Sequence, residues 1–331
     1  MPSGRRSVES SRSLSPHCRK RLTWSAGWRW TPQLWLSAPE PQPATCSQSV
    51  QATRARTQCA IWARRPTLSI RCWRGGTVVE LTCTDFGGSG ELLIVGPSLG
   101  TSVEALWGAC VPHLTPSFRV VGWDLPGHGR SAPATGFEIA EIADSLRKVA
   151  TELTTGNTWY AGVSVAGAVG FALAVDPGPY TAITTLAAAA KIGEAGAWYE
   201  RADLVRAAST SAVIAGSVER WFGPGFTDRD PRTVARLLDS LTDADAPSYA
   251  ATCEALARFD GRGRLGSATV PVLVAAGRHD RVVPPELAQD SAERLPEATS
   301  YVFEGSAHLP PAEEPAAVAN VLTEFFQRGG R

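Results

Sequence analysis

The 331-residue chain has one methionine, five histidines and seven cysteines, and it lacks a long apolar run. A transmembrane helix needs about 20 consecutive apolar residues, and no stretch approaches that length, so we expect a soluble, cytoplasmic protein. Cys83, Cys110 and Cys253 lie far apart without metal-ligand spacing, as is typical of buried thiols in a reducing compartment. Because a Walker loop and a dinucleotide fingerprint are also missing, we expect neither a metal nor a cofactor.

The first 76 residues differ in composition from the rest of the chain. Up to Arg74 there are 13 lysines and arginines but only two acidic residues, whereas the remainder has 19 basic and 30 acidic residues. No period of 3.6 or 2 is sustained here, and prolines and serines interrupt every candidate element. Since Met1 is the only methionine, we expect residues 1–76 to be an extension that is disordered or not part of the natural protein. A basic arm that binds nucleic acid and a transit peptide are the alternatives.

From about Thr77 onward, short apolar segments alternate with amphipathic ones. This alternation predicts an α/β domain around a mostly parallel sheet, formed by residues 77–190 and 260–329. Residues 191–259 show helical patterns only, and they predict a helical cap, or lid, inserted after the sixth strand. Ligands of such sheets bind at the carboxyl ends of the strands, so the loops at that edge are where we look for a site.

One hydroxyl lies among small residues in "WYAGVSVAGAVG" (159–170). In a strand–nucleophile–helix elbow the serine adopts a positive φ, and its neighbours must be small. Gly162 lets the strand pass close to the helix, while Ala166 replaces the second glycine of the usual G-x-S-x-G pattern. Taken alone, Ser164 is either a turn residue or a nucleophile at the N-terminus of a helix.

A nucleophilic serine needs a base, and the base needs an acid that orients it. In proteins with this elbow the chain order is Ser, then Asp or Glu, then His. Asp280 follows an apolar strand in "AAGRHDRVVPP", and His308 follows the last strand in "FEGSAHLPPAEEP". His128 lies in a glycine-rich turn, where we expect a structural role, and His279 precedes the last strand. We therefore predict a catalytic triad of Ser164, Asp280 and His308.

The oxyanion that forms when such a serine attacks a carbonyl needs two preorganised N–H donors. Val165 directly follows the nucleophile, so its backbone N–H is one predicted donor. The second is expected from the turn-rich loop "GPSLGTS" (96–102), where we choose the N–H of Leu99 because only the backbone of this residue matters.

The chain resembles the α/β-hydrolases, and more narrowly the 3-oxoadipate enol-lactonases of that family. The resemblance extends from about Val79 to Phe326 and is carried by "GPSLGTSVEALW", "FRVVGWDLPGHGRS", "GVSVAGAVG", "AAAAKIGEAGAWYERADLVRA", "VERWFGPGF" and "GSAHLPPAEEP". It implies an α/β-hydrolase fold and hydrolysis of a small-molecule lactone to 3-oxoadipate, in protocatechuate and catechol breakdown. It implies no cofactor, and no nucleic acid or membrane as a partner.

The same resemblance implies a site for the substrate's carboxylate near the cap. Lys191 and Arg201 are the candidate cations, and Trp198 is the candidate apolar wall. Because the sequence does not fix the pocket volume, a carboxylesterase, a cofactor-free perhydrolase and a C–C hydrolase with the same triad are alternatives. A non-catalytic ligand receptor is a further alternative, since receptors of this fold can keep their triad.

Overall fold

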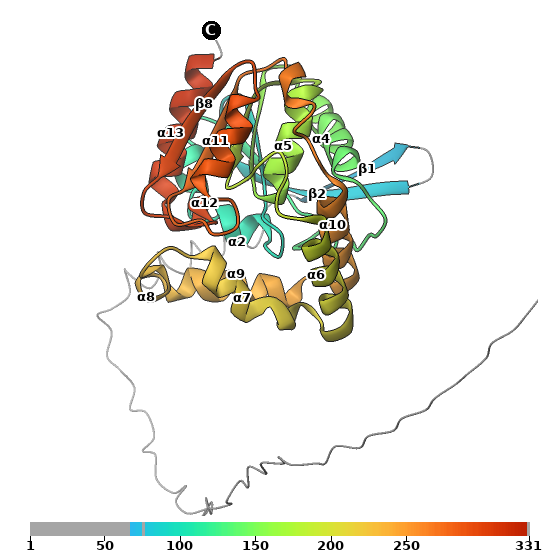
Figure 1. Ribbon diagram of the computed structural model, residues 1–331. Helices are drawn as coiled ribbons and strands as arrows, with labels where there is room; N and C mark the ends of the chain where they lie inside the picture. The colour runs from blue at the N-terminus through green and yellow to red at the C-terminus, as the bar shows by residue number, and fades with distance from the viewer. Residues whose placement is uncertain (1–66, 75–76, 330–331) are drawn as a thin grey trace, which may run out of the picture. The chain divides into compact units, whose positions relative to one another are not determined.

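The computed structural model describes residues 67–74 and 77–329, and Figure 1 shows one sheet flanked by helices. The eight strands run in the order β1-β2-β4-β3-β5-β6-β7-β8. Strand β2 is antiparallel to β1 and β4, and all other neighbours are parallel. Their bounds are Thr67–Arg74, Thr77–Gly87, Leu92–Gly96, Arg119–Trp123, Thr158–Val163, Tyr180–Leu186, Val272–Gly277 and Ala298–Phe303 for β1 to β8.

The central strands are apolar because helices cover both faces of a parallel sheet. Every residue of β3, β5 and β7 is buried. Helix α4 packs beside α5, and α13 packs beside α3. The helices of this core are α2 Val103–Trp107, α3 Val111–Leu114, α4 Ile139–Leu153, α5 Val165–Val175, α11 Pro285–Glu293, α12 Pro310–Glu313 and α13 Pro315–Gly329. The α/β fold predicted from the alternating pattern is confirmed.

The strand register brings the loops of the site to one edge of the sheet. Gly96 at the end of β3 pairs with Gly162 near the end of β5. Val163 pairs with Leu186 of β6, which in turn pairs with Ala275 of β7. The loops that leave β3, β5, β6 and β7 therefore start at the same carboxyl edge.

Between β6 and β7, all of which is described, the chain forms helices and no strand. Figure 1 shows them gathered at one end of the core, on the side of α2 and α12. Asp230 and Asp245 begin two of these helices by accepting hydrogen bonds from N–H groups three residues later, which satisfies donors that a helix start leaves free. The bounds are α6 Ala195–Ala208, η1 Thr210–Val213, α7 Ile214–Trp221, α8 Phe226–Arg229, α9 Pro231–Asp243, α10 Ala246–Arg258 and, past the predicted cap, η2 Leu265–Ser267.

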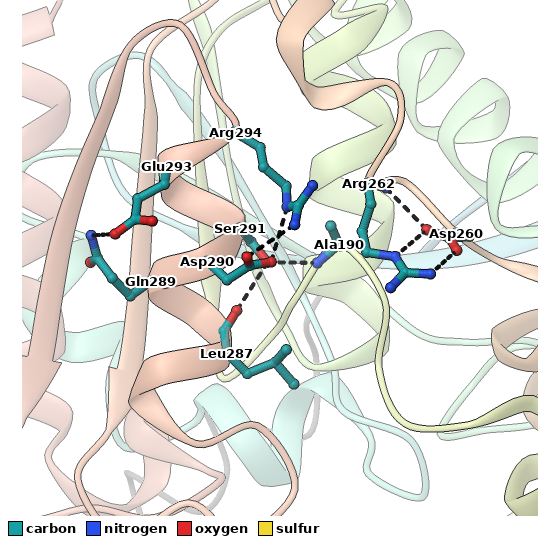
Figure 2. Close-up of polar contacts among 9 residues, drawn as sticks. All are labelled: Ala190, Asp260, Arg262, Leu287, Gln289, Asp290, Ser291, Glu293 and Arg294. Carbon is teal, nitrogen blue, oxygen red and sulfur yellow. Dashed lines mark hydrogen bonds and ion pairs between the residues drawn. The ribbon is translucent and has the colours of Figure 1, made fainter.

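The cap leaves and re-enters the core at neighbouring points, which we call the cap junction (residues 190–191 and 260–261). The N–H of Gly261 donates to the carbonyl of Ala190 at 2.8 Å. The N–H of Ala190 in turn donates to the Ser291 hydroxyl of α11 at 2.9 Å, as Figure 2 shows. In the same view Arg262 forms a two-pronged pair with Asp260. The junction is thus tied to α11, the helix that follows the Asp280 loop.

One boundary predicted from the sequence needs correction. Residues 67–74, which we assigned to the extension, form strand β1 and pair along their whole length with β2. In "TLSIRCWR" apolar letters at 68, 70 and 72 alternate with polar ones, and this period of 2 is typical of a strand. The rest of the predicted extension, 1–66 and 75–76, lies outside the described residues. Among the described helices, none has the length and apolar content to cross a membrane.

Candidate active site

Ser164 lies at the sharp turn between β5 and α5. Its φ of 56° and ψ of −113° are far from the usual regions for a residue with a side chain, a conformation that costs about 1–3 kcal/mol and is retained when the surroundings over-determine it. Its N–H donates to the carbonyl of Leu186 at 2.8 Å. A Cβ on Gly162 would lie 2.3 Å from the carbonyl oxygen of Ala166, so the elbow requires glycine at this position.

Ala166, the departure from the G-x-S-x-G pattern, fits because of the residue opposite it. A Cβ added to Gly96 of β3 would lie 2.6 Å from the Ala166 methyl group. The extra methyl on α5 therefore occupies space that a side chain at residue 96 would need. The Tyr160 hydroxyl donates to the Ala166 carbonyl at 2.8 Å, and this bond holds the first turn of α5 against the sheet.

His308 and Asp280 form a buried pair at the carboxyl edge of the sheet. The distance from His308 Nδ1 to Asp280 Oδ2 is 2.8 Å, and both side chains are almost fully buried. The other carboxyl oxygen of Asp280 accepts from the N–H groups of Val282 and Val283. A carboxylate only accepts hydrogen bonds, so Nδ1 donates in this pair, and in the neutral imidazole Nε2 has the lone pair.

The two predicted oxyanion donors also lie at this edge. Leu99 sits in a tight turn, in which the N–H of Thr101 donates to the carbonyl of Ser98 and the N–H of Ser98 donates to the Thr101 hydroxyl, both at 3.0 Å. Val165 is the first residue of α5. Within the described part of the chain, the N–H groups of Leu99 and Val165 have no hydrogen-bond acceptor, so both are available to a ligand.

A cavity of about 370 Å³ lies between these core loops and the cap helices. Both sides contribute to its wall, and the cap supplies two aromatic side chains and two arginines. The lining residues are Ser98, Leu99, Ser164, Gly193, Glu194, Ala197, Trp198, Arg201, Arg220, Trp221, Arg281, Val282 and His308. The structure therefore brings the predicted residues Ser164, His308, Leu99, Trp198 and Arg201 to one cavity.

Arg201 and Arg220 place two positive charges at the cap side of the cavity. Arg201 donates to the hydroxyl of Tyr249 at 2.9 Å and lies over its ring. Burial, and then the charge of Arg201, lower the pKa of the Arg220 guanidinium. Neither arginine forms an ion pair with a carboxylate among the described residues. Arg281 also lines the cavity, so its wall has three guanidinium groups and one carboxylate, that of Glu194. This excess of positive charge favours an anionic group in the cavity.

Arg220 is not among the residues predicted from the sequence. The available signal was its position in "VERWFGPGF", one of the stretches that carry the resemblance. Lys191, in contrast, is predicted from the sequence to bind the substrate but does not line the cavity. Its ammonium group pairs with Asp260 at 3.9 Å at the cap junction, so it has a carboxylate partner outside the site.

The turn after β4 contains two buried titratable side chains, Asp124 and His128. Asp124 accepts from the N–H groups of Val103 and Arg130 at 2.7 and 3.0 Å, and burial raises its pKa to about 6. His128 is fully enclosed, stacks on Tyr249 and places Nδ1 2.9 Å from the carbonyl of Pro126. Burial lowers its pKa to about 4. His128 is absent from the cavity wall, in line with the structural role predicted for it.

Comparisons with known proteins agree with this geometry. Residues 91–315 match the family model for the alpha/beta hydrolase fold. The chain is 32% identical over 253 residues to 3-oxoadipate enol-lactonase 2 of Acinetobacter baylyi, covering 76% of this chain and 94% of the relative. It is 29% identical to a pimeloyl-[acyl-carrier protein] methyl ester esterase of Vibrio vulnificus, covering 67% of this chain and 89% of the relative.

Among solved structures, the enol-lactonase from Burkholderia xenovorans is similar, with a TM-score of 0.71 and 26% identity. The match covers 75% of this chain and 97% of that structure. The family model spans most of the chain, and the elbow, the Asp280–His308 pair and the sheet order fit the same architecture. The chain belongs to the alpha/beta hydrolase family, and within that family it resembles the 3-oxoadipate enol-lactonases.

Proposed function

We propose that this protein is a serine hydrolase that opens the lactone ring of 3-oxoadipate enol-lactone. The observation that carries the proposal is the meeting of Ser164, on its positive-φ elbow, with His308 in one cavity, where Asp280 holds His308 by its Nδ1. A strained serine beside an oriented imidazole is the arrangement that nucleophilic acyl transfer requires.

In this mechanism the Ser164 hydroxyl attacks the lactone carbonyl and His308 Nε2 takes its proton. The developing oxyanion accepts from the free N–H groups of Leu99 and Val165, which are fixed before the substrate arrives. Collapse of the tetrahedral intermediate breaks the ring C–O bond and expels the enolate, which is a good leaving group and takes the proton from His308. The neutral His308 then deprotonates a water molecule that attacks the acyl-enzyme. As the ester bond to Ser164 breaks, His308 returns this proton to the serine oxygen and 3-oxoadipate is released.

The substrate assignment is supported by the charge of the cavity and by the relatives. The lactone carries one carboxylate, and Arg201 and Arg220 line the cap side of the cavity without a carboxylate partner among the described residues. Trp198 and Trp221 supply flat apolar walls for the ring. Two of the relatives matched by this chain are enol-lactonases from Acinetobacter baylyi.

Esterase activity on an open-chain ester is the second candidate, because relatives from Vibrio are pimeloyl-[acyl-carrier protein] methyl ester esterases. The same triad would serve both reactions, and pimelate monomethyl ester, a small ester with a free carboxylate, can pair with the same arginines. The two candidates differ in the leaving group, an enolate oxygen tethered to the product in the lactone and a free methanol in the ester.

The deciding experiment is a comparison of three substrates with the full-length protein and its Ser164→Ala variant. The substrates are the enol-lactone, followed by loss of its ultraviolet absorbance, a pimelate monomethyl ester and a neutral aryl acetate. We expect the lactone to have the highest kcat/KM and Ser164→Ala to lose about 10⁴-fold or more in kcat. If the protein hydrolyses the methyl ester but not the lactone, the esterase activity replaces the lactonase activity as the proposed function. A folded protein that turns over none of the three would contradict the proposed hydrolase activity.

A further inference from the structure

Glu313 lies at the end of α12 with its carboxylate almost fully buried. One oxygen, Oε1, accepts from the N–H groups of Ala307 and Leu309 at 2.9 and 3.3 Å. These two residues flank His308, so the carboxylate holds the backbone on both sides of the histidine. Burial raises the pKa of Glu313, and the backbone N–H donors and His308 partly offset this rise.

The second carboxyl oxygen of Glu313 makes a contact of a different kind. Oε2 accepts from the N–H of Gly223 at 2.6 Å, and Gly223 belongs to the cap, between α7 and α8. Two residues earlier, the carbonyl of Trp221 accepts from the N–H of His308 at 3.1 Å. The cap segment 221–223 is therefore hydrogen-bonded to the histidine loop at two points.

This attachment involves a different part of the cap from the cap junction. At the junction the cap is joined to the core covalently and by the Ala190–Gly261 hydrogen bond. At segment 221–223 it is joined by the two hydrogen bonds described above, and Glu313 is the side chain that accepts one of them. Arg220 and Trp221, which line the cavity, directly precede Gly223. The hydrogen bond to Gly223 therefore also fixes the positions of Arg220 and Trp221 relative to His308.

We propose that Glu313 is a positioning residue that latches the cap onto the loop of His308. The proposal rests on the proposed function, in which His308 is the base. One carboxylate serves both sides, so the cavity wall formed by Arg220 and Trp221 keeps a fixed position relative to the imidazole. Other hydrogen bonds join the cap to the core at Ser240, Asp245, Ser248 and Arg258. Glu313 holds the part of the cap that carries the cavity wall.

The two oxygens of Glu313 can be separated by substitution. In Glu313→Gln the single amide oxygen is best placed toward the two donors of the histidine loop, which leaves the amide NH₂ facing the N–H of Gly223. That variant loses the cap contact and keeps the core contact. Glu313→Ala loses both. The neighbouring Glu314→Gln is a matched control, because the Glu314 carboxylate accepts from the N–H of Gly305 within the core.

Hydrogen–deuterium exchange tests the latch directly. For Glu313→Gln we expect faster exchange in peptides covering residues 221–226 than in the wild type, and unchanged exchange there for Glu314→Gln. Steady-state kinetics supply the second readout. We expect Glu313→Gln to raise KM for the lactone about tenfold, because a charge-assisted hydrogen bond is lost. Labelling of Ser164 by a small neutral fluorophosphonate should keep its rate, whereas Glu313→Ala should slow it.

Three results would overturn the proposal: unchanged exchange at 221–226 in Glu313→Gln, an unchanged KM, or a labelling rate that falls as far as kcat/KM in that variant. A wild-type protein that fluorophosphonate does not label would contradict the proposed function, while the exchange experiment would still decide the latch. Gly223→Ala approaches the latch from the cap side, since its Cβ would lie 3.1 Å from Glu313 Oε2. It should raise KM and the exchange rate in the same way, and wild-type values would count against the latch.

Discussion

At the scale of single residues, the two arginines at the cap side of the cavity have different neighbours. A Cβ on Gly216 would lie 3.0 Å from both terminal nitrogens of Arg220, one turn later on α7. The guanidinium thus folds over a position without a side chain, where it lies among the residues that line the cavity. Arg201 is held in place differently, by the Tyr249 hydroxyl and ring. The two charges are therefore positioned by independent neighbours.

Replacing Arg220 by glutamine should reduce the preference for anionic substrates. We expect KM for the lactone to rise about tenfold, since a charge-assisted pair with a carboxylate contributes about 1.5–3 kcal/mol. KM for a neutral aryl acetate should stay within about twofold, because this substrate has no carboxylate to lose a partner. Arg229→Gln is the matched control, since Arg229 lies over Phe226 and does not line the cavity. If Arg220→Gln raises KM for both substrates equally, Arg220 does not bind the substrate's carboxylate.

At the scale of elements, the buried Asp124 carboxylate connects the turn after β4 to the start of α2. It accepts from the N–H of Val103, the first residue of α2, and from that of Arg130. A Cβ on Gly129 would lie 2.4 Å from the same carboxylate. The glycine-rich turn thus lets the backbone close around a group that burial holds away from water.

This carboxylate predicts a specific pH dependence of stability. Its pKa is about 6 in the folded protein, above the ordinary value of 3.8, so between about pH 4 and 6 the folded state binds more protons than the unfolded state. The free energy of unfolding should therefore fall as the pH rises through this window, by at most about 3 kcal/mol from this group.

Urea unfolding from pH 4 to 7, compared between the wild type and Asp124→Asn, measures this contribution. The variant is expected to be less stable at every pH, because its amide cannot accept from both N–H groups. Its stability should lack the extra decline, so the difference between the two proteins should shrink as the pH rises. Parallel curves would show that Asp124 keeps an ordinary pKa.

The helices, strands and loops of this fold are easier to predict from the sequence than the contacts between them. Local patterns predict the elbow at Ser164 and the loops of Asp280 and His308, because each follows a buried strand and the parallel sheet brings such ends together. Arg220 and Glu313 are not predicted in this way. Tertiary packing sets the orientation of the helix that carries Arg220. It also sets the pairing of the Glu313 carboxylate with the N–H of Gly223, 90 residues away. Neither is visible in a local sequence period.

At the scale of the whole molecule, β1 covers one edge of the sheet and β8 forms the other. Within the sheet β1 pairs with β2 alone, and it also lies beside α4. Without β1, the N–H and C=O groups of β2 on that side would have no partner, and open edges of this kind promote association between chains.

A chain that starts at Thr77 should therefore be less stable than one that starts at Thr67. We expect a lower midpoint of thermal unfolding and an apparent mass that grows with concentration, measured by calorimetry and by sedimentation. The kcat of the two chains should agree at low concentration, since none of the cavity-lining residues is on β1 or β2. Equal midpoints would show that β1 contributes nothing to stability.

The closeness of the two ends of the cap has a consequence for how this architecture diversifies. Because Ala190 and Gly261 are hydrogen-bonded neighbours, everything between them is an insertion whose ends already meet. A different insertion could be spliced between the same two positions without changing the strand order or the elbow. Ser164, Asp280 and His308 lie outside this insertion, whereas Arg201 and Arg220 lie within it. Exchange of the insertion would therefore replace the cap side of the cavity wall and keep the core side.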